Sequence, residues 1–134
     1  MRLNLARLRH LLHWVVDLVP ASYLPGKIEI LEGQVRKSFR GYAFGSDEVK
    51  LHVPAILPKY PRRYTYRKGA GALRFGCPCD EFVALVAHEL RHVGQSRAPK
   101  AEQPGQAEID AEAFARFALE KFQARKRCRH GATA

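Results

Sequence analysis

The sequence predicts an α+β fold in which one helix is followed by several strands and then by two further helices. Apolar residues recur at helical spacing in residues 1–19, they alternate with polar residues between residues 28 and 75, and helical patterns return from residue 80 onward. Strands grouped in this way favour a small antiparallel or mixed sheet. The chain has 134 residues, 46 % of them hydrophobic, so we expect residues 1–134 to form one domain with its own core.

An apolar stripe predicts the N-terminal helix. Leu5, Leu8, Leu12, Val15 and Val19 lie on one face, with basic and polar residues opposite. Charged residues and histidines interrupt the stretch too often for a signal peptide, and no run is long enough to span a bilayer. We expect an amphipathic helix packed on the domain, with a surface-membrane anchor as the alternative. The protein is then expected to be cytoplasmic.

Strand-like alternation follows the first helix. A first strand is expected around Ile30, a long second strand at residues 35–44, and a turn at residues 45–47. Residues 49–53 alternate most clearly and predict a half-buried third strand. Residues 73–75 predict a short last strand that leads into the next helix.

The helix expected from Asp80 to Gln95 carries the sequence His-Glu-Leu-Arg-His, which reads H-E-x-x-H. Asp80 is a suitable N-cap, because its short carboxylate can accept hydrogen bonds from the first helical N–H groups. Helical residues four apart project from one face, so His88 and His92 can hold one metal ion. Glu89 is then placed to reach a water molecule on that metal. This arrangement is typical of zinc hydrolases.

A hydrolytic zinc site usually needs a third protein ligand. The metzincin pattern would place it six residues after His92, where the chain has Ala98. A second helix, expected from Gln106 to about Arg127, offers an alternative, because Glu108 and Glu112 share a narrow arc of it. Both carboxylates can face a metal together, and Asp110 then cannot.

These residues resemble the small gluzincins, in which H-E-x-x-H is followed by E-x-x-x-D/E on a second helix, and they are similar to ImmA/IrrE-type metallopeptidases. The resemblance covers about residues 80–120, with Glu112 where the pattern usually has Asp. It implies a zincin-like fold in which Glu108 completes a Zn²⁺ site with His88 and His92, while Glu112 orients an imidazole.

The same resemblance implies a zinc metallopeptidase that cleaves a peptide or protein substrate. Zinc-activated water would attack the scissile carbonyl, with Glu89 as the general base. Zincins commonly bind substrate along an edge strand, here expected to be residues 49–53 or 73–75. A second oxyanion donor is usual, and the candidates are Tyr60, Tyr64, Tyr66, His52 and Arg91.

Charge suggests a rival function. The formal net charge is +10, and residues 59–68 interleave bases with aromatic residues, as many nucleic-acid surfaces do. The same charge also suits acidic protein substrates or a solvated face. The rival to a peptidase is a zincin-like metal-binding regulatory or nucleic-acid-binding module without peptidase activity.

The cysteines leave a further possibility open. Cys77 and Cys79 precede the H-E-x-x-H helix, while Cys128 and His130 lie near the end of the last helix. If the two helices are antiparallel, these four residues approach one another and offer a structural zinc site. Reduced thiols and a disulfide to Cys128 are the alternatives.

Overall fold

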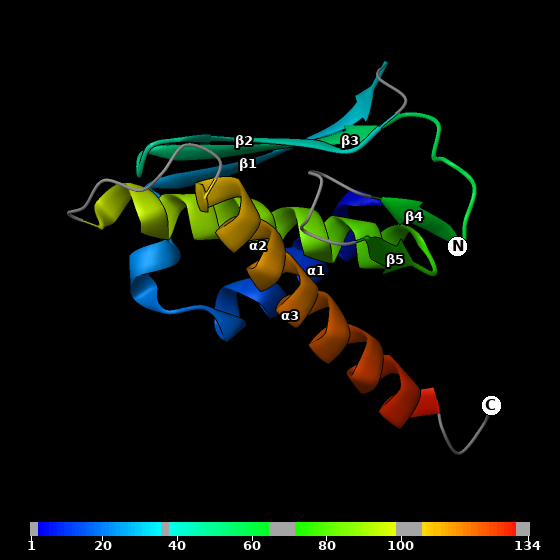
Figure 1. Ribbon diagram of the computed structural model, residues 1–134. Helices are drawn as coiled ribbons and strands as arrows, with labels where there is room; N and C mark the ends of the chain where they lie inside the picture. The colour runs from blue at the N-terminus through cyan, green and yellow to red at the C-terminus, as the bar shows by residue number, and fades with distance from the viewer. Residues whose placement is uncertain (1–2, 36–37, 65–71, 99–105, 131–134) are drawn as a thin grey trace.

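The computed structural model describes residues 3–35, 38–64, 72–98 and 106–130, with side chains described as far as Arg125. Its α+β element order confirms the predicted fold class (Figure 1). The elements are α1 (Leu5–Leu18), a 3-10 turn η1 (Ala21–Tyr23), β1 (Lys27–Gln34), β2 (Arg40–Phe44), β3 (Glu48–Pro54), β4 (Arg62–Tyr64), β5 (Leu73–Phe75), α2 (Pro78–Arg97) and α3 (Gln106–His130).

The larger sheet is mixed and has the strand order β1-β3-β2. β1 runs parallel to β3, whereas β2 is antiparallel to β3 across the turn at residues 45–47. Val49, Leu51 and Val53 point inward from β3 and are buried, as their alternation predicts. The strands β4 and β5 form a separate antiparallel ribbon.

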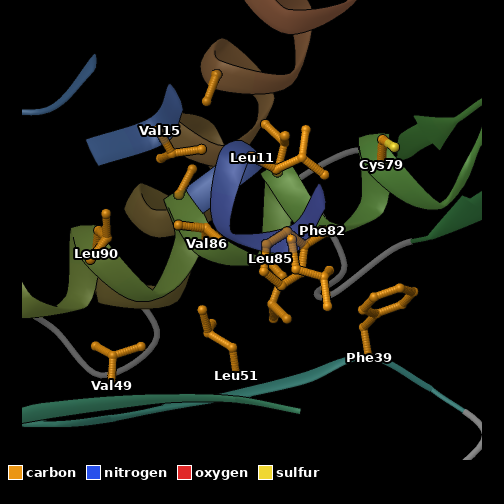
Figure 2. Close-up of a cluster of buried hydrophobic side chains, with 14 of the residues drawn as sticks. Leu11, Val15, Phe39, Val49, Leu51, Cys79, Phe82, Leu85, Val86 and Leu90 are labelled. Atoms are coloured by element: carbon orange, nitrogen blue, oxygen red, sulfur yellow. The ribbon is translucent and has the colours of Figure 1, made fainter. Parts of the chain in front are cut away.

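Helix α2 is the centre of the molecule. The three-stranded sheet lies along one side of it, and α1 and α3 pack on other sides (Figure 1). Phe82, Val86 and Leu90 of α2 join Leu51 of β3 and Leu11 of α1 in one core (Figure 2). Every residue from Pro78 to Leu90 is buried, because strands and helices cover this helix on several sides.

The N-terminal helix packs on the domain as predicted. Asn4 caps α1 by accepting a hydrogen bond from the Arg7 N–H at 2.8 Å, and Leu8, Leu11 and Val15 are buried. In the described part of the chain, no helix combines the length and apolar character needed to cross a bilayer.

Helix α2 begins earlier than predicted, so the assignment of Asp80 as N-cap is wrong. The cap is Cys77, and Pro78 occupies the first turn, where its missing N–H costs nothing. Asp80 lies inside that turn and accepts hydrogen bonds from the Gly76 N–H at 2.8 Å and from Gln123 at 3.1 Å. Its carboxylate therefore ties the helix start to β5 and α3.

Two strand predictions also need correction. The long strand expected at residues 35–44 is shorter, since β1 continues to Gln34, Val35 is 96 % exposed and β2 begins at Arg40. Residues 49–53 lie in β3, the middle strand, so they have no free edge for a substrate. The edge strand beside α2 is β2.

Candidate metal centre

Helices α2 and α3 run antiparallel, and this brings the predicted ligands together. At one end Gln95 of α2 donates to the Ala107 carbonyl at 2.8 Å, and at the other end Gln123 of α3 reaches Asp80. Glu108, near the start of α3, consequently lies opposite the face of α2 that carries His88 and His92. Sequence spacing predicted each helix face correctly, and the crossing of the helices makes the two faces meet.

Three potential ligand groups converge. The Nε2 atoms of His88 and His92 are 3.1 Å apart, and the Glu108 carboxylate places its Oε2 atom 3.3 Å from His88 Nε2 and its Oε1 atom 2.9 Å from His92 Nε2. Donors placed tetrahedrally at roughly 2.0–2.1 Å from zinc are about 3.3 Å from one another. Two imidazoles and one carboxylate at these separations fit a single zinc ion.

The partner of His88 fixes how that ring can coordinate. Its Nδ1 lies 3.3 Å from Oε2 of Glu112, a carboxylate that is 1 % exposed. An ionised carboxylate only accepts hydrogen bonds, so it favours the tautomer with the proton on Nδ1. The Nε2 lone pair of His88 then points toward His92 and Glu108. The Glu112 role expected from the resemblance is thus geometrically available.

Glu89 lies beside these residues and is only 5 % exposed. Burial raises the pKa of Glu89, the two imidazoles lower it, and the Glu108 charge raises it again, with a net shift above its ordinary value. Burial by itself lowers the pKa of His88, but Glu112, Glu89 and Glu108 together raise it. The neighbouring carboxylates therefore favour the positively charged form of His88.

Gly41 of β2 is a site residue that sequence reasoning did not identify. A Cβ at this position would lie 2.5 Å from Cγ of Glu89 and 2.8 Å from its Oε2. Only glycine lets the edge strand approach the Glu89 carboxylate so closely. The sequence signal was a glycine inside a strand pattern, which often marks close backbone approach.

The ligand face opens into a cleft of about 650 Å³. β2 and the residues before it form one wall, α2 and Glu108 form the other, and Tyr64 of β4 lies on the rim. The cleft has an extended backbone on one side and the converging ligands on the other. Such a shape suits an extended chain.

Of the five candidate oxyanion donors, Tyr64 alone among those described lines the cleft. The hydroxyl of Tyr60 donates to Glu81 at 2.6 Å, His52 lies 3.4 Å from Gln34, and Arg91 pairs with Asp110 at 2.5 Å. These three predictions are not supported by the geometry. Tyr66 lies outside the described residues.

The basic stretch at residues 59–68 is described only as far as Tyr64. The rings of Tyr60 and Tyr64 pack against the second hydrophobic cluster, which contains Leu73 and Phe75. Arg62 pairs with Glu81 at 3.3 Å. A nucleic-acid stacking surface needs exposed rings, and the described half of this stretch uses its rings for packing.

Only two of the four residues in the predicted cysteine site have described side chains. Cys79 is buried and Cys77 is partly buried at the start of α2, whereas the side chains of Cys128 and His130 lie outside the described residues. A hydrogen bond with Cys77, together with burial, raises the pKa of the Cys79 thiol, and Arg7 partly opposes this. A raised thiol pKa disfavours the thiolate that metals bind.

Sequence reasoning also missed a polar group behind His92. The Nδ1 atom of His92 lies 2.7 Å from Oε1 of Gln95, whose amide nitrogen in turn contacts Asp110 at 2.9 Å. Asp110 is not one of the three converging residues, as its position on the helix predicted, and it pairs with Arg91 of α2. The signal in the sequence was weak, because a helix-surface glutamine carries no motif.

No protein-family model, curated protein or solved structure matches the chain. The geometry of the site is therefore the basis for any statement about function.

Proposed function

We propose that the protein is a zinc-dependent metallopeptidase with a zincin-like architecture. The observation that carries the proposal is the convergence of His88, His92 and Glu108 on one point, with the buried carboxylate of Glu89 beside it. Two imidazoles and one carboxylate are a ligand set that hydrolytic zinc sites use, and they leave a fourth position for water or substrate.

Zinc held there would lower the pKa of water and polarise a carbonyl group. Glu89 acts as the general base, taking the proton from the attacking water and later delivering it to the leaving amine. Its carboxylate is buried beside the converging ligands and contacts the cleft, which places it within reach of a water molecule held there. The Tyr64 hydroxyl on the cleft rim is the candidate second donor to the oxyanion.

The substrate would bind along β2. This strand pairs with β3 on one side only, so its other edge offers backbone N–H and C=O groups to an extended peptide. The residues of β2 line the same cleft as the ligands, and Gly41 brings its backbone next to Glu89. A peptide added to this edge would pass the general base with its carbonyl groups in reach.

The proposal is tested by metal analysis and by cleavage of an unfolded protein. The purified chain should contain about one zinc per molecule and should cleave an unfolded casein-type substrate, and a chelator should stop the cleavage. Glu89→Gln should keep the zinc and lose about 10²- to 10⁴-fold in rate, since it loses the general base. Cleavage by the Gln variant at the wild-type rate would refute the role of Glu89.

A different result would favour the regulatory alternative. Zinc binding without any cleavage, combined with a shift of labelled DNA that weakens steeply as salt rises, is what a nucleic-acid-binding module would give. A peptidase and a nucleic-acid-binding module therefore differ both in substrate cleavage and in the salt-sensitive DNA shift.

A further inference from the structure

Gln95 occupies a junction between a metal-binding helix and the helix that carries the third ligand. It lies on α2, three residues after His92, and its side chain makes three polar contacts. The amide oxygen meets His92 Nδ1 at 2.7 Å, and the amide nitrogen meets the Ala107 carbonyl at 2.8 Å and Asp110 Oδ2 at 2.9 Å. The Gln95 side chain thus contacts His92 and one residue on each side of Glu108 in the sequence, Ala107 and Asp110.

The chemistry of these partners fixes the orientation of the amide. A backbone carbonyl and an ionised carboxylate are acceptors only, so the NH₂ group of Gln95 must face α3. Its oxygen must then face His92, and an amide oxygen can only accept. His92 therefore carries its proton on Nδ1 and presents the Nε2 lone pair toward His88 and Glu108.

A second layer holds Gln95 in place. Asp110, which accepts from Gln95, is paired with Arg91 Nε at 2.5 Å, and an Arg91 N–H donates to the hydroxyl of Tyr23 in η1. Tyr23 can lie there because residue 94 is glycine: a Cβ would come within 2.6 Å of the tyrosine ring. Gln95 thus joins α2 to α3 directly, and Arg91 and Asp110 link it to Tyr23 of η1.

We propose that Gln95 is a positioning residue that sets two of the three ligands at once. It selects the metal-binding tautomer of His92, and by holding Ala107 and Asp110 it fixes the turn of α3 that carries Glu108. Asp110 and Arg91 act through Gln95 and touch no ligand themselves. The inference rests on the proposed function only in assuming that this site binds zinc, and it does not require peptide cleavage.

The test measures zinc affinity by chelator competition. Gln95→Leu keeps the size of the side chain and removes its polar contacts, and it should weaken zinc binding by about 10- to 100-fold. The matched control is Gln123→Leu, a second glutamine that bridges α2 and α3 through Asp80 and the Arg74 carbonyl, far from the ligands. That control should bind zinc within about twofold of the wild type.

Two further variants separate positioning from simple loss of stability. Gln95→Glu keeps an acceptor for His92 but loses the donors to α3, so it should recover part of the affinity that Gln95→Leu loses. Asp110→Ala should weaken binding less than Gln95→Leu, and adding it to Gln95→Leu should cause no further loss, because Asp110 acts through the missing amide. If Asp110→Ala and Gln95→Leu weakened zinc binding equally and additively, this would contradict the proposal that Asp110 acts through Gln95.

A spectroscopic readout completes the test. In the full chain loaded with Co²⁺ in place of zinc, Gln95→Leu should change the visible ligand-field bands, whereas Gln123→Leu should leave them unchanged. Wild-type zinc affinity and spectrum in Gln95→Leu would overturn the inference and leave the proposed function intact. Zinc binding that depends on Gln95 without peptide cleavage would overturn the function and support the inference. A wild-type chain that binds no zinc overturns both.

Discussion

Helix α2 carries two polar clusters that are built in opposite ways. At its start, each buried acid has donors: Asp80 accepts from a backbone N–H and an amide, and Glu81 accepts from Tyr60 and Arg62. The ligand-bearing half of the helix differs. Among the described residues, no lysine or arginine pairs with Glu89 in that half of α2, or with Glu108 and Glu112 of α3, which lie against it.

The two clusters satisfy their acids in different ways. Burying a charge costs free energy unless it is paired, and the first cluster offers hydrogen-bond donors to both of its acids, although burial still raises the pKa of Glu81. In the second cluster, Glu108 and Glu112 have imidazoles as partners, and burial raises the pKa of Glu89. This arrangement supports the proposal that a cation binds among these side chains.

The largest expected effect comes from removing a ligand. His92→Ala takes one of the two imidazoles from the second cluster, so bound zinc should fall from about one per chain to background, and cleavage should fall with it. His92 is partly exposed, and the fold should survive the change. Zinc content after dialysis measures the effect. Full zinc occupancy in this variant would show that the cation lies elsewhere.

Gly41→Ala tests the approach of β2 to the general base. The added Cβ would collide with Glu89, so either the strand or the carboxylate must move by about an ångström, and such a misplacement costs on the order of 10²-fold in rate. Zinc affinity should stay close to the wild type, because no ligand is touched. Steady-state cleavage together with zinc titration gives both values; an unchanged rate would contradict the assigned position of the base.

Glu112→Gln and Glu81→Gln compare the two clusters directly. Both replace a buried carboxylate with its neutral isostere. Glu112→Gln should weaken zinc binding about tenfold, because His88 loses a charged partner. Glu81→Gln should leave zinc affinity unchanged, because its partners are Tyr60 and Arg62. Chelator-competition titrations of both variants measure the two zinc affinities. Equal losses of zinc affinity would show that the two clusters do not differ in this respect.

The smallest effect concerns pH and the first cluster. Burial raises the pKa of Glu81 despite Tyr60 and Arg62, so the folded chain binds that proton more tightly than the unfolded chain does. Protonated Glu81 therefore contributes to the free energy of unfolding. This contribution is complete below the ordinary pKa of glutamate and is lost as the pH rises through the raised pKa of Glu81. Relative to Glu81→Gln, the wild type should therefore become less stable in urea unfolding as the pH rises above the ordinary value of 4.5. A wild type that becomes more stable relative to Glu81→Gln as the pH rises would contradict this prediction.

The two pairs of candidate site residues were predictable because their geometry is local. The spacing of His88 and His92, and that of Glu108 and Glu112, follows from the helical repeat alone. The meeting of the two faces depends on an antiparallel crossing, which the short connector between the helices favours. The fold class followed from the same patterns, since grouped strands and two terminal helices leave few arrangements.

What escaped prediction depends on contacts between distant segments. Gly41 matters only because β2 lies against Glu89, and Gln95 only because α3 begins beside it. Asp80 was misassigned because a good N-cap residue also works inside the first turn, where it can bind a preceding N–H. Residues 49–53 were a poor choice of substrate strand because alternation reveals burial but not strand order.

The central claim, that one cation lies between two imidazoles and the Glu108 carboxylate, is tested most directly by zinc X-ray absorption on the zinc-loaded protein. We expect a first shell of nitrogen and oxygen at about 2.0–2.1 Å, with the outer-shell scattering of two imidazoles and no sulfur. A sulfur shell at about 2.3 Å would place the metal at the cysteines and contradict the account.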